Sequence, residues 1–245
     1  MHNKRVSTTI SVVLLGLIAV AFIFPFVWMV ATSLKPTTEV FSLSPTGSRI
    51  AWDNYPSALN SIPFGRVVLN SFIVSLAGAA LVVVVSVLSA YAFARLRFKG
   101  RDHLFMLFLG TLVLPQEVLV IPLYIGMQRM GLVNSYFALI VPFAFGAFGA
   151  FLIRQFLMSL PLEFEEAARI DGCSDWQILR KILLPLLKAP ITVVGVFAFI
   201  DYWSAFLWPL IVVNDSTLAT IPLGLQMFSG ERGTDWGPLM AAVTM

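Results

Sequence analysis

The stretch EEAARIDGCSDWQILRKILLPLL, from Glu165 to Leu187, is the most charged part of a chain that otherwise consists of long apolar runs. Acidic residues cluster where it begins, and acids near a helix N-terminus interact favourably with the helix dipole. We expect Ser159 to cap this helix and Pro161 to lie in its first turn. Gly172 tolerates a positive φ and is typical of a helix end. The sequence therefore predicts a short helix that ends in a glycine turn.

A second helix is predicted directly after that turn. Ser174 and Gln177 stand three residues apart, the spacing of a capping box. Arg180 and Lys181 lie on one side of this helix until Pro185 disturbs it. The other side is apolar and carries Ile178, Leu179, Ile182, Leu183 and Leu186. Such a helical hairpin can lie in a membrane interface without a partner, read DNA as a helix-turn-helix, or dock a cytoplasmic protein.

The composition of the chain indicates whether it is surrounded by water or by lipid. Of the 245 residues, 58% are hydrophobic and 12% are charged, whereas a soluble domain carries about 25% charged residues. With a mean hydropathy of +0.88, the chain has too little polar surface for a water-soluble globule, so we predict an integral membrane protein in contact with lipid. The single cysteine excludes an internal disulfide, and the sequence offers neither a metal-ligand cluster nor the basic, aromatic-interleaved face of a nucleic-acid-binding protein.

Five apolar segments are long enough to cross a hydrocarbon core about 30 Å thick, and a sixth begins near the end of the sequence. Pro115 and Pro122 interrupt the third segment, whereas Gly146 and Gly149 of the fourth permit close helix approach. Ten residues cannot cross a bilayer, so we expect the sixth helix to continue beyond Met245. The segments are residues 10–31, 67–94, 104–125, 136–157, 191–213 and 236–245.

The distribution of basic residues predicts the orientation in the membrane. The first apolar run is too long for a signal peptide, and Ala31-Thr32-Ser33 is a poor cleavage site, so we expect the run to be retained as a helix. With the N-terminus inside, eleven basic residues lie on the inner side and five on the outer side, a positive-inside bias. The inner set is Lys4, Arg5, Arg95, Arg97, Lys99, Arg101, Arg154, Arg169, Arg180, Lys181 and Lys188, and the outer set is Lys35, Arg49, Arg66, Arg129 and Arg232.

This orientation places the charged stretch in the cytoplasm between two spans. Such tethering, together with its mixed charge, disfavours a DNA-reading helix. A short, rigid hairpin between two spans is well suited to transmit a push to them, so docking of a cytoplasmic protein is the interpretation we favour over an interfacial hairpin without a partner.

The spacing within this stretch resembles the EAA signature of ABC importer permease subunits. Its pattern, E-A-A-x3-G-x9-I-x-L-P, is matched at every fixed position by Glu166, Ala167, Ala168, Gly172, Ile182, Leu184 and Pro185. Further similarity covers nearly the whole chain and is closest to the second permease subunit of maltose-type and glycerol-phosphate-type carbohydrate-uptake systems. It includes residues 25–29, 32–35, 54–55, 70–71, 221–225 and 236–242.

The resemblance implies an all-α membrane protein of six transmembrane helices, the type I ABC importer permease fold, with a cytoplasmic coupling helix. It implies a first helix and outer loop over residues 1–66 and a permease core over 67–245, with the coupling loop at 159–187. In this family Glu166 would pair with a basic residue of the ATPase, Ala167 and Ala168 would allow close packing, and Gly172 would permit the turn. The same loop contributes Asp171, Ile182 and Pro185.

The resemblance also implies partners for the chain. These are a related permease with which it forms a heterodimer, two ATP-binding subunits inside, and a solute-binding protein outside the bacterial inner membrane. The sequence contains no Walker A loop, so we expect a non-catalytic subunit that binds no cofactor itself, while the partner ATPase uses ATP and magnesium. The expected cargo is a sugar or sugar-like solute, whose identity the binding protein would largely select.

Polar residues within the spans are candidates for the substrate path, because such residues are costly in lipid. They are Asn70, Gln116, Glu117, Asp201 and Trp203. Glu117 could instead be solvated at the membrane boundary, and Asp201 could pair with a base of a partner subunit. Relatives commonly have Trp-Asn and then a polar residue where this chain has Trp203, Ser204 and Ala205, so contacts made by that pair are not carried over.

Two other classes of protein are weaker alternatives. A secondary transporter for a small polar solute would usually contain internal repeats, and the sequence shows none. An intramembrane enzyme would need a motif such as H-E-x-x-H or G-x-S-x-G, and neither is found.

Overall fold

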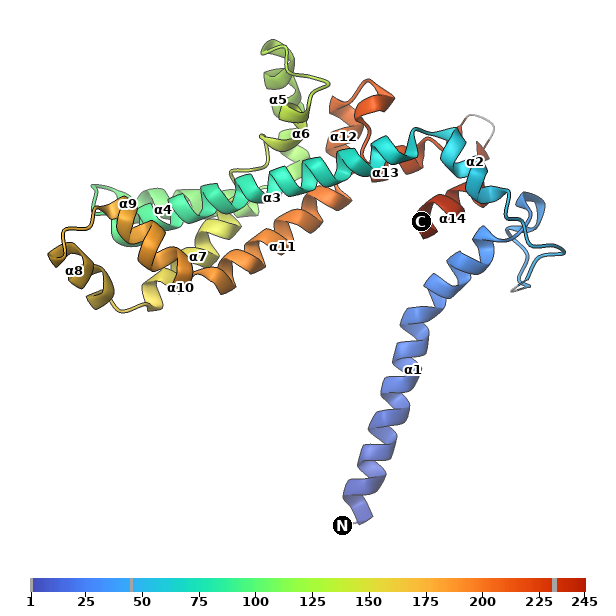
Figure 1. The fold of residues 1–245 in the computed structure, drawn as a ribbon, viewed down its shortest axis with the longest axis horizontal. Helices are drawn as coiled ribbons and strands as arrows, with labels where there is room; N and C mark the ends of the chain where they lie inside the picture. The colour runs from blue at the N-terminus through green and yellow to red at the C-terminus, as the bar shows by residue number, and fades with distance from the viewer. Residues whose placement is uncertain (1, 45, 231–232) are drawn as a thin grey trace. The chain divides into compact units, whose positions relative to one another are not determined.

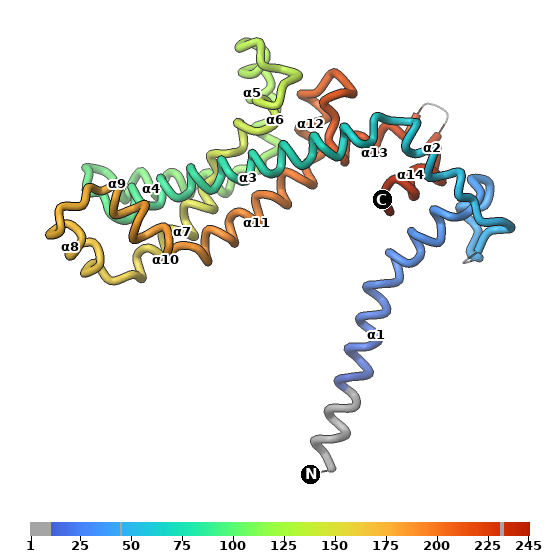
Figure 2. The backbone as a smooth tube through the Cα atoms, viewed as in Figure 1, coloured from blue at the N-terminus to red at the C-terminus, as the bar shows by residue number. Residues whose placement is uncertain are grey.

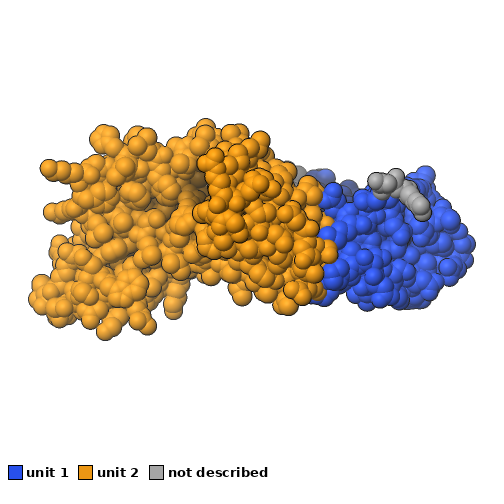
Figure 3. Space-filling model, turned by 90° about the horizontal axis from the view of Figure 1, so that it is seen from above, with its two compact units in different colours: residues 1–65, 224–245 blue, residues 66–223 orange. Residues whose placement is uncertain are grey.

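The computed structural model describes residues 2–44, 46–230 and 233–245, with side chains from residue 11 onward. Arg232 and the side chains of Lys4 and Arg5, which contribute to the charge count, lie outside this description. The chain divides into two compact units, residues 1–65 with 224–245 and residues 66–223 (Figure 3). Residues 224–245, which the sequence analysis placed in the core, group with the N-terminal residues because α14 (Trp236–Thr244) packs against α1 (His2–Ser33) and α2 (Asn54–Ser61).

The first unit is built around the end of α1. From residue 11 to residue 25 every side chain of this helix is exposed, as expected of a helix that faces lipid. After the helix ends, the Nζ atom of the buried Lys35 lies 4.5 Å from the centre of the Trp28 ring and donates to the carbonyl of Ser42. The unit also contains the short elements η1 (Thr37–Glu39), β1 (Ser229–Gly230) and β2 (Gly233–Thr234), of which β1 and β2 pair antiparallel.

The second unit contains three long helices that run side by side, α3 (Phe64–Arg95), α7 (Ala147–Ser159) and α11 (Lys188–Ser204) (Figure 1). Their close approach depends on small residues. A Cβ atom on Gly78 would lie 2.6 Å from ring atoms of Tyr202, and one on Gly149 would collide with Ser86. Gly146, which we expected to serve the same purpose, has open space around it. It is the extended residue immediately before α7 and lies outside the helix.

The remaining elements of this unit are short because the predicted spans are broken. They are α4 (Arg101–Gly110), η2 (Thr111–Val113), α5 (Gln116–Arg129), α6 (Tyr136–Ile140), α8 (Glu163–Ile170), α9 (Asp175–Ile178), η3 (Leu179–Leu183, a π-helical turn), α10 (Leu184–Leu186), α12 (Leu207–Val212) and η4 (Ser216–Leu218), while α13 (Ile221–Gln226) crosses the boundary between the units. At Pro115 the chain bends by 102°, since the residue before a proline is driven out of the helical region.

Among the described residues, two helices are long and apolar enough to cross a membrane alone, residues 11–33 of α1 and all of α3. Three pairs of helices pass the same test only if each bent pair is taken as one span, which gives up to five. Two of these pairs bend at the ends of the charged stretch, by 79° between α7 and α8 and by 80° between α10 and α11. Figure 2 follows the backbone through both bends.

Candidate functional site

The charged stretch forms a helical hairpin, defined here as residues 159–187, at the end of the α3, α7 and α11 bundle (Figure 1). Its first helix begins at Glu163, later than the sequence predicts. Ser159 ends α7 instead of capping α8, because its hydroxyl donates to the carbonyl of Phe156, and Pro161 lies in the connection. The acidic first turn of α8 agrees with the prediction.

One face of α8 is turned away from the bundle. Glu163, Glu166, Ala167 and Ile170 share this face, because positions i, i+3, i+4 and i+7 align on an α-helix. All four are exposed, Ile170 by 87%. The opposite face is buried and carries Glu165 and Ala168. The outward face therefore combines two carboxylates, a small residue and a bare apolar side chain, and we call it the α8 face.

The glycine turn has the predicted geometry. Gly172 adopts a φ of +80°, and the Cys173 N–H donates to the carbonyl of Ala168 over 2.9 Å, as in helices that end in a left-handed residue. The capping box at the start of α9 is also confirmed, since Ser174 and Gln177 exchange both hydrogen bonds. Across the turn, Arg169 pairs with Asp175 at 2.8 Å. Asp171 is exposed at the turn itself.

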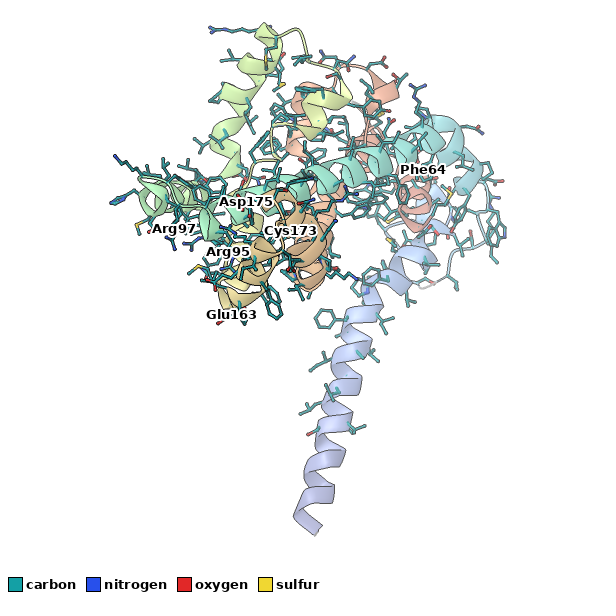
Figure 4. All side chains as sticks on the ribbon, turned by 60° about the vertical axis from the view of Figure 1, so that its left-hand side comes forward. Phe64, Arg95, Arg97, Glu163, Cys173 and Asp175 are labelled. Carbon is teal, nitrogen blue, oxygen red and sulfur yellow. The ribbon has the colours of Figure 1, made fainter. Side chains whose placement is uncertain are left out.

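A buried ion pair fastens the hairpin to α3, and sequence reasoning missed it. The Nε atom of Arg95 and the Oε1 atom of Glu165 lie 2.5 Å apart, with side chains only 7% and 5% exposed. The same guanidinium donates to the carbonyls of Leu157 and Leu160, which lie at the C-terminal end of α7. Figure 4 shows Arg95 close to the hairpin residues Cys173 and Asp175, far from Phe64 at the other end of α3. Arg95 thus joins α3, α7 and α8 in one cluster.

The second helix of the hairpin is fastened by apolar packing. Its buried residues contact α3 and α7 in one cluster, which includes Ile178, Leu179, Leu183 and Leu187 of the hairpin, Val87, Ala90 and Tyr91 of α3, and Ile153 and Leu157 of α7. Ile182 packs at the edge of this cluster, whereas Pro185 is exposed. Pro185 has no N–H to donate, and the π-helical turn ends two residues before it, at Leu183. The hairpin therefore packs against α3 and α7 and, through Val194, against α11.

A cavity of about 400 Å³ lies elsewhere in the second unit. Three of the predicted substrate-path residues line it, Gln116 and Glu117 at the start of α5 and Asp201 near the end of α11. Ser204 and exposed aromatic rings line it as well; the rings belong to Phe148, Phe197 and Phe206. Sequence reasoning did not single out these aromatic residues, because apolar residues in a membrane helix carry no signal of which side they face.

The other two candidates lie outside the cavity lining. Asn70 is buried, and its amide donates to the carbonyls of Thr217 and Ala219 while its oxygen accepts from Tyr136. These contacts make Asn70 a link between α3 and the loop before α13. Trp203 packs edge-on against Phe72, with ring centres 4.9 Å apart.

Helices that break around a cavity containing a few polar side chains are typical of membrane transport proteins. Together with a polar hairpin fixed to the ends of three bundle helices, this arrangement defines the class as a helical membrane transport subunit. Residues 82–245 match the family described as binding-protein-dependent transport system inner membrane component. The chain therefore belongs to this family and is an inner-membrane permease subunit of the ABC importer type. The resemblance read from Glu166 to Pro185 is confirmed, as is the all-α membrane fold.

Similar proteins cover the chain almost completely. The sn-glycerol-3-phosphate transport system permease protein UgpE of Pectobacterium atrosepticum is 37% identical and covers 100% of this chain and 91% of its own length. The lactose transport system permease protein LacG of Rhizobium radiobacter is 32% identical, over 97% of this chain and 87% of its own. The fold matches the crystal structure of a bacterial ABC transporter involved in the import of the acidic polysaccharide alginate, with a TM-score of 0.85 at 22% identity, over 100% of this chain and 92% of that one.

Proposed function

We propose that this chain is the membrane subunit through which an ABC importer passes a sugar or sugar-like solute, and that separate ATPase subunits drive it through the hairpin. The single observation that carries the proposal is the α8 face, which is exposed while the rest of the hairpin packs in one buried cluster with α3 and α7. A bare isoleucine beside a small alanine fits an apolar hollow on a partner, and Glu163 and Glu166 fit basic residues around that hollow.

The anchoring of the hairpin supports a mechanical role. Interfaces and packed cores respond to a push by moving as units rather than deforming continuously. Glu165 ties α8 to Arg95, and the apolar side of the second helix lies on α3 and α7. When ATP and magnesium close the two ATPase subunits, the hairpin would carry their motion into the bundle and switch the permease between inward-open and outward-open states.

Membership of the family supports the proposed assembly. The chain would pair with a related permease, hold two ATP-binding subunits on the cytoplasmic side, and receive solute from an extracytoplasmic binding protein, with its own N-terminus in the cytoplasm. The relatives are named for sn-glycerol-3-phosphate and for lactose, which supports a sugar or sugar-like cargo for this chain.

The test replaces a single charge on the α8 face. Glu166→Lys should leave membrane insertion intact, greatly reduce the amount of ATPase that co-purifies with the permease, and abolish ATP-dependent uptake in vesicles. Asp53→Lys is the matched control, because Asp53 is a carboxylate with a 78% exposed side chain in the first unit, outside the hairpin. Full ATPase retention in Glu166→Lys would refute the docking role, and uptake that persists without any ATPase would favour a secondary transporter.

A further inference from the structure

The second unit places two carboxylates in one cavity without a basic residue beside them. Glu117 and Asp201 both line the space, and its lining includes no lysine, arginine or histidine. Both residues are exposed. Within the described part of the chain, none of the ion pairs involves either of them. The chain itself therefore does not neutralise this pair of charges.

The cavity lies where helices break. α5 begins at Gln116, α7 begins just after Gly146, and α11 ends at Ser204, and all three positions line the cavity. Helix ends leave backbone polar groups unpaired, and irregular backbone at membrane depth is tolerated where it is buried in protein or lines a water-filled space. A volume of about 400 Å³ is also within the range of small-molecule sites. The cavity is thus suited to hold water and a polar solute.

The partial charges at the helix ends do not cancel the negative charge of the cavity. Each end carries a partial charge of about half a unit, positive at the N-terminus and negative at the C-terminus. The positive ends of α5, α7 and α12 and the negative end of α11 lie at the cavity, so the helix ends together contribute about one positive charge. This is less than the two negative charges that the carboxylates of Glu117 and Asp201 can carry.

Aromatic rings in the cavity lining provide apolar surface beside the polar groups. Phe148, Phe197 and Phe206 expose large parts of their rings, while the polar atoms of the buried Tyr202 and Trp208 are already bonded to the carbonyls of Ile140 and Ala138. Carboxylates and the amide of Gln116 can bond to hydroxyls or amines, and the rings can pack against the C–H face of a sugar.

We propose that this cavity is a solute subsite of the permease and that it selects carbohydrates without negative charge, either neutral or amino sugars, over those that bear a phosphate, carboxylate or sulfonate. This inference rests on the proposed function and adds the charge class of the cargo. A cavity lined by charge of one sign raises the local concentration of oppositely charged species about tenfold or more, and it excludes species of its own sign to a similar degree.

A thiol reporter in the assembled importer tests the charge. Ser204→Cys is introduced in a Cys173→Ala background and treated with methanethiosulfonate reagents that carry either a trimethylammonium or a sulfonate group. Ser61→Cys is the matched control, because both serines are exposed and donate their hydroxyl to the carbonyl four residues earlier. At the cavity reporter, the ratio of cationic to anionic labelling should exceed that of the control about tenfold or more, and Glu117→Gln with Asp201→Asn should remove the excess.

Protection by three sugars of matched ring size tests the selectivity. Glucose and glucosamine at millimolar concentration should slow labelling of the Ser204→Cys reporter, and glucuronate should not. Equal protection by glucuronate, absence of protection by glucose and glucosamine, or absence of the cationic preference overturns the proposal. So does failure of both reagents to react until the partner permease is removed, because a partner side chain would then occupy the cavity. ATPase co-purification from the same samples separates these outcomes from a failure of the docking role.

Discussion

A glutamine at position 165 should make the hairpin open about a hundredfold more often. Glu165 and Arg95 are 2.5 Å apart and nearly inaccessible to solvent, and breaking a buried ion pair by removing one partner costs about 3–5 kcal/mol. Glutamine keeps the volume of the side chain, and Arg95 retains its two carbonyl acceptors at Leu157 and Leu160. We therefore take the lower end, about 3 kcal/mol, which corresponds to a factor of about one hundred in an equilibrium constant.

The chain contains its own probe for this opening. Cys173 is the single cysteine of the sequence, and it packs half-buried against the cluster that fastens the hairpin. The rate at which a thiol-reactive dye labels Cys173 in the detergent-purified permease should rise about a hundredfold in Glu165→Gln, if hairpin opening limits access to the thiol.

Glu166→Gln is the matched control, because the two glutamates are neighbours and only Glu165 is buried. Its labelling rate should stay within about twofold of the native rate, while its ATPase co-purification falls. Arg95→Met combined with Glu165→Leu should recover much of the stability, since an apolar pair can replace a buried ion pair at little cost. Equal labelling rates for Glu165→Gln and Glu166→Gln would refute the reasoning.

Three further substitutions test the packing and the turn. Gly172→Val forces a β-branched residue to a φ of +80° and should cost about 1–2 kcal/mol, seen as faster dye labelling in the turn; an unchanged rate would count against the turn geometry. Gly149→Ala drives a methyl group into Ser86 and should destabilise the permease by about 1–3 kcal/mol, whereas Gly146→Ala should leave Tm unchanged; equal Tm values would contradict the packing. Asn70→Leu strands buried carbonyls and should cost about 3 kcal/mol in thermal unfolding while ATPase retention persists; an undiminished Tm would favour a role in the solute path.

The local structure of the hairpin could be predicted from the sequence because short-range chemistry determines it. The positive φ of Gly172 and the capping box of Ser174 with Gln177 depend on residues within one turn of each other. The bend at Pro115 is equally local. The start of α8 was misplaced, because the hydroxyl of Ser159 bonds backward to α7, and a serine between two helices can serve either of them.

The long-range parts could not be predicted in the same way. Arg95 counted in the sequence as one of several inner basic residues, and nothing near it signals that it pairs with a glutamate 70 residues later. The cavity likewise depends on how α5, α7 and α11 meet. Of the polar candidates, Gln116, Glu117 and Asp201 converge there, whereas the buried amide of Asn70 is taken up by backbone carbonyls.

The difference between continuous and broken spans bears on how the chain is synthesised. α1 and α3 can each satisfy their backbone and cross the bilayer without help from other segments, and both emerge early from the ribosome. The later segments are bent or interrupted. The unpaired backbone N–H and C=O groups at their helix ends must be covered by neighbouring helices before these segments can leave the insertion machinery. We expect α3 to act as the template on which the later helices assemble, so that a defect in α3 disturbs biogenesis before it disturbs transport.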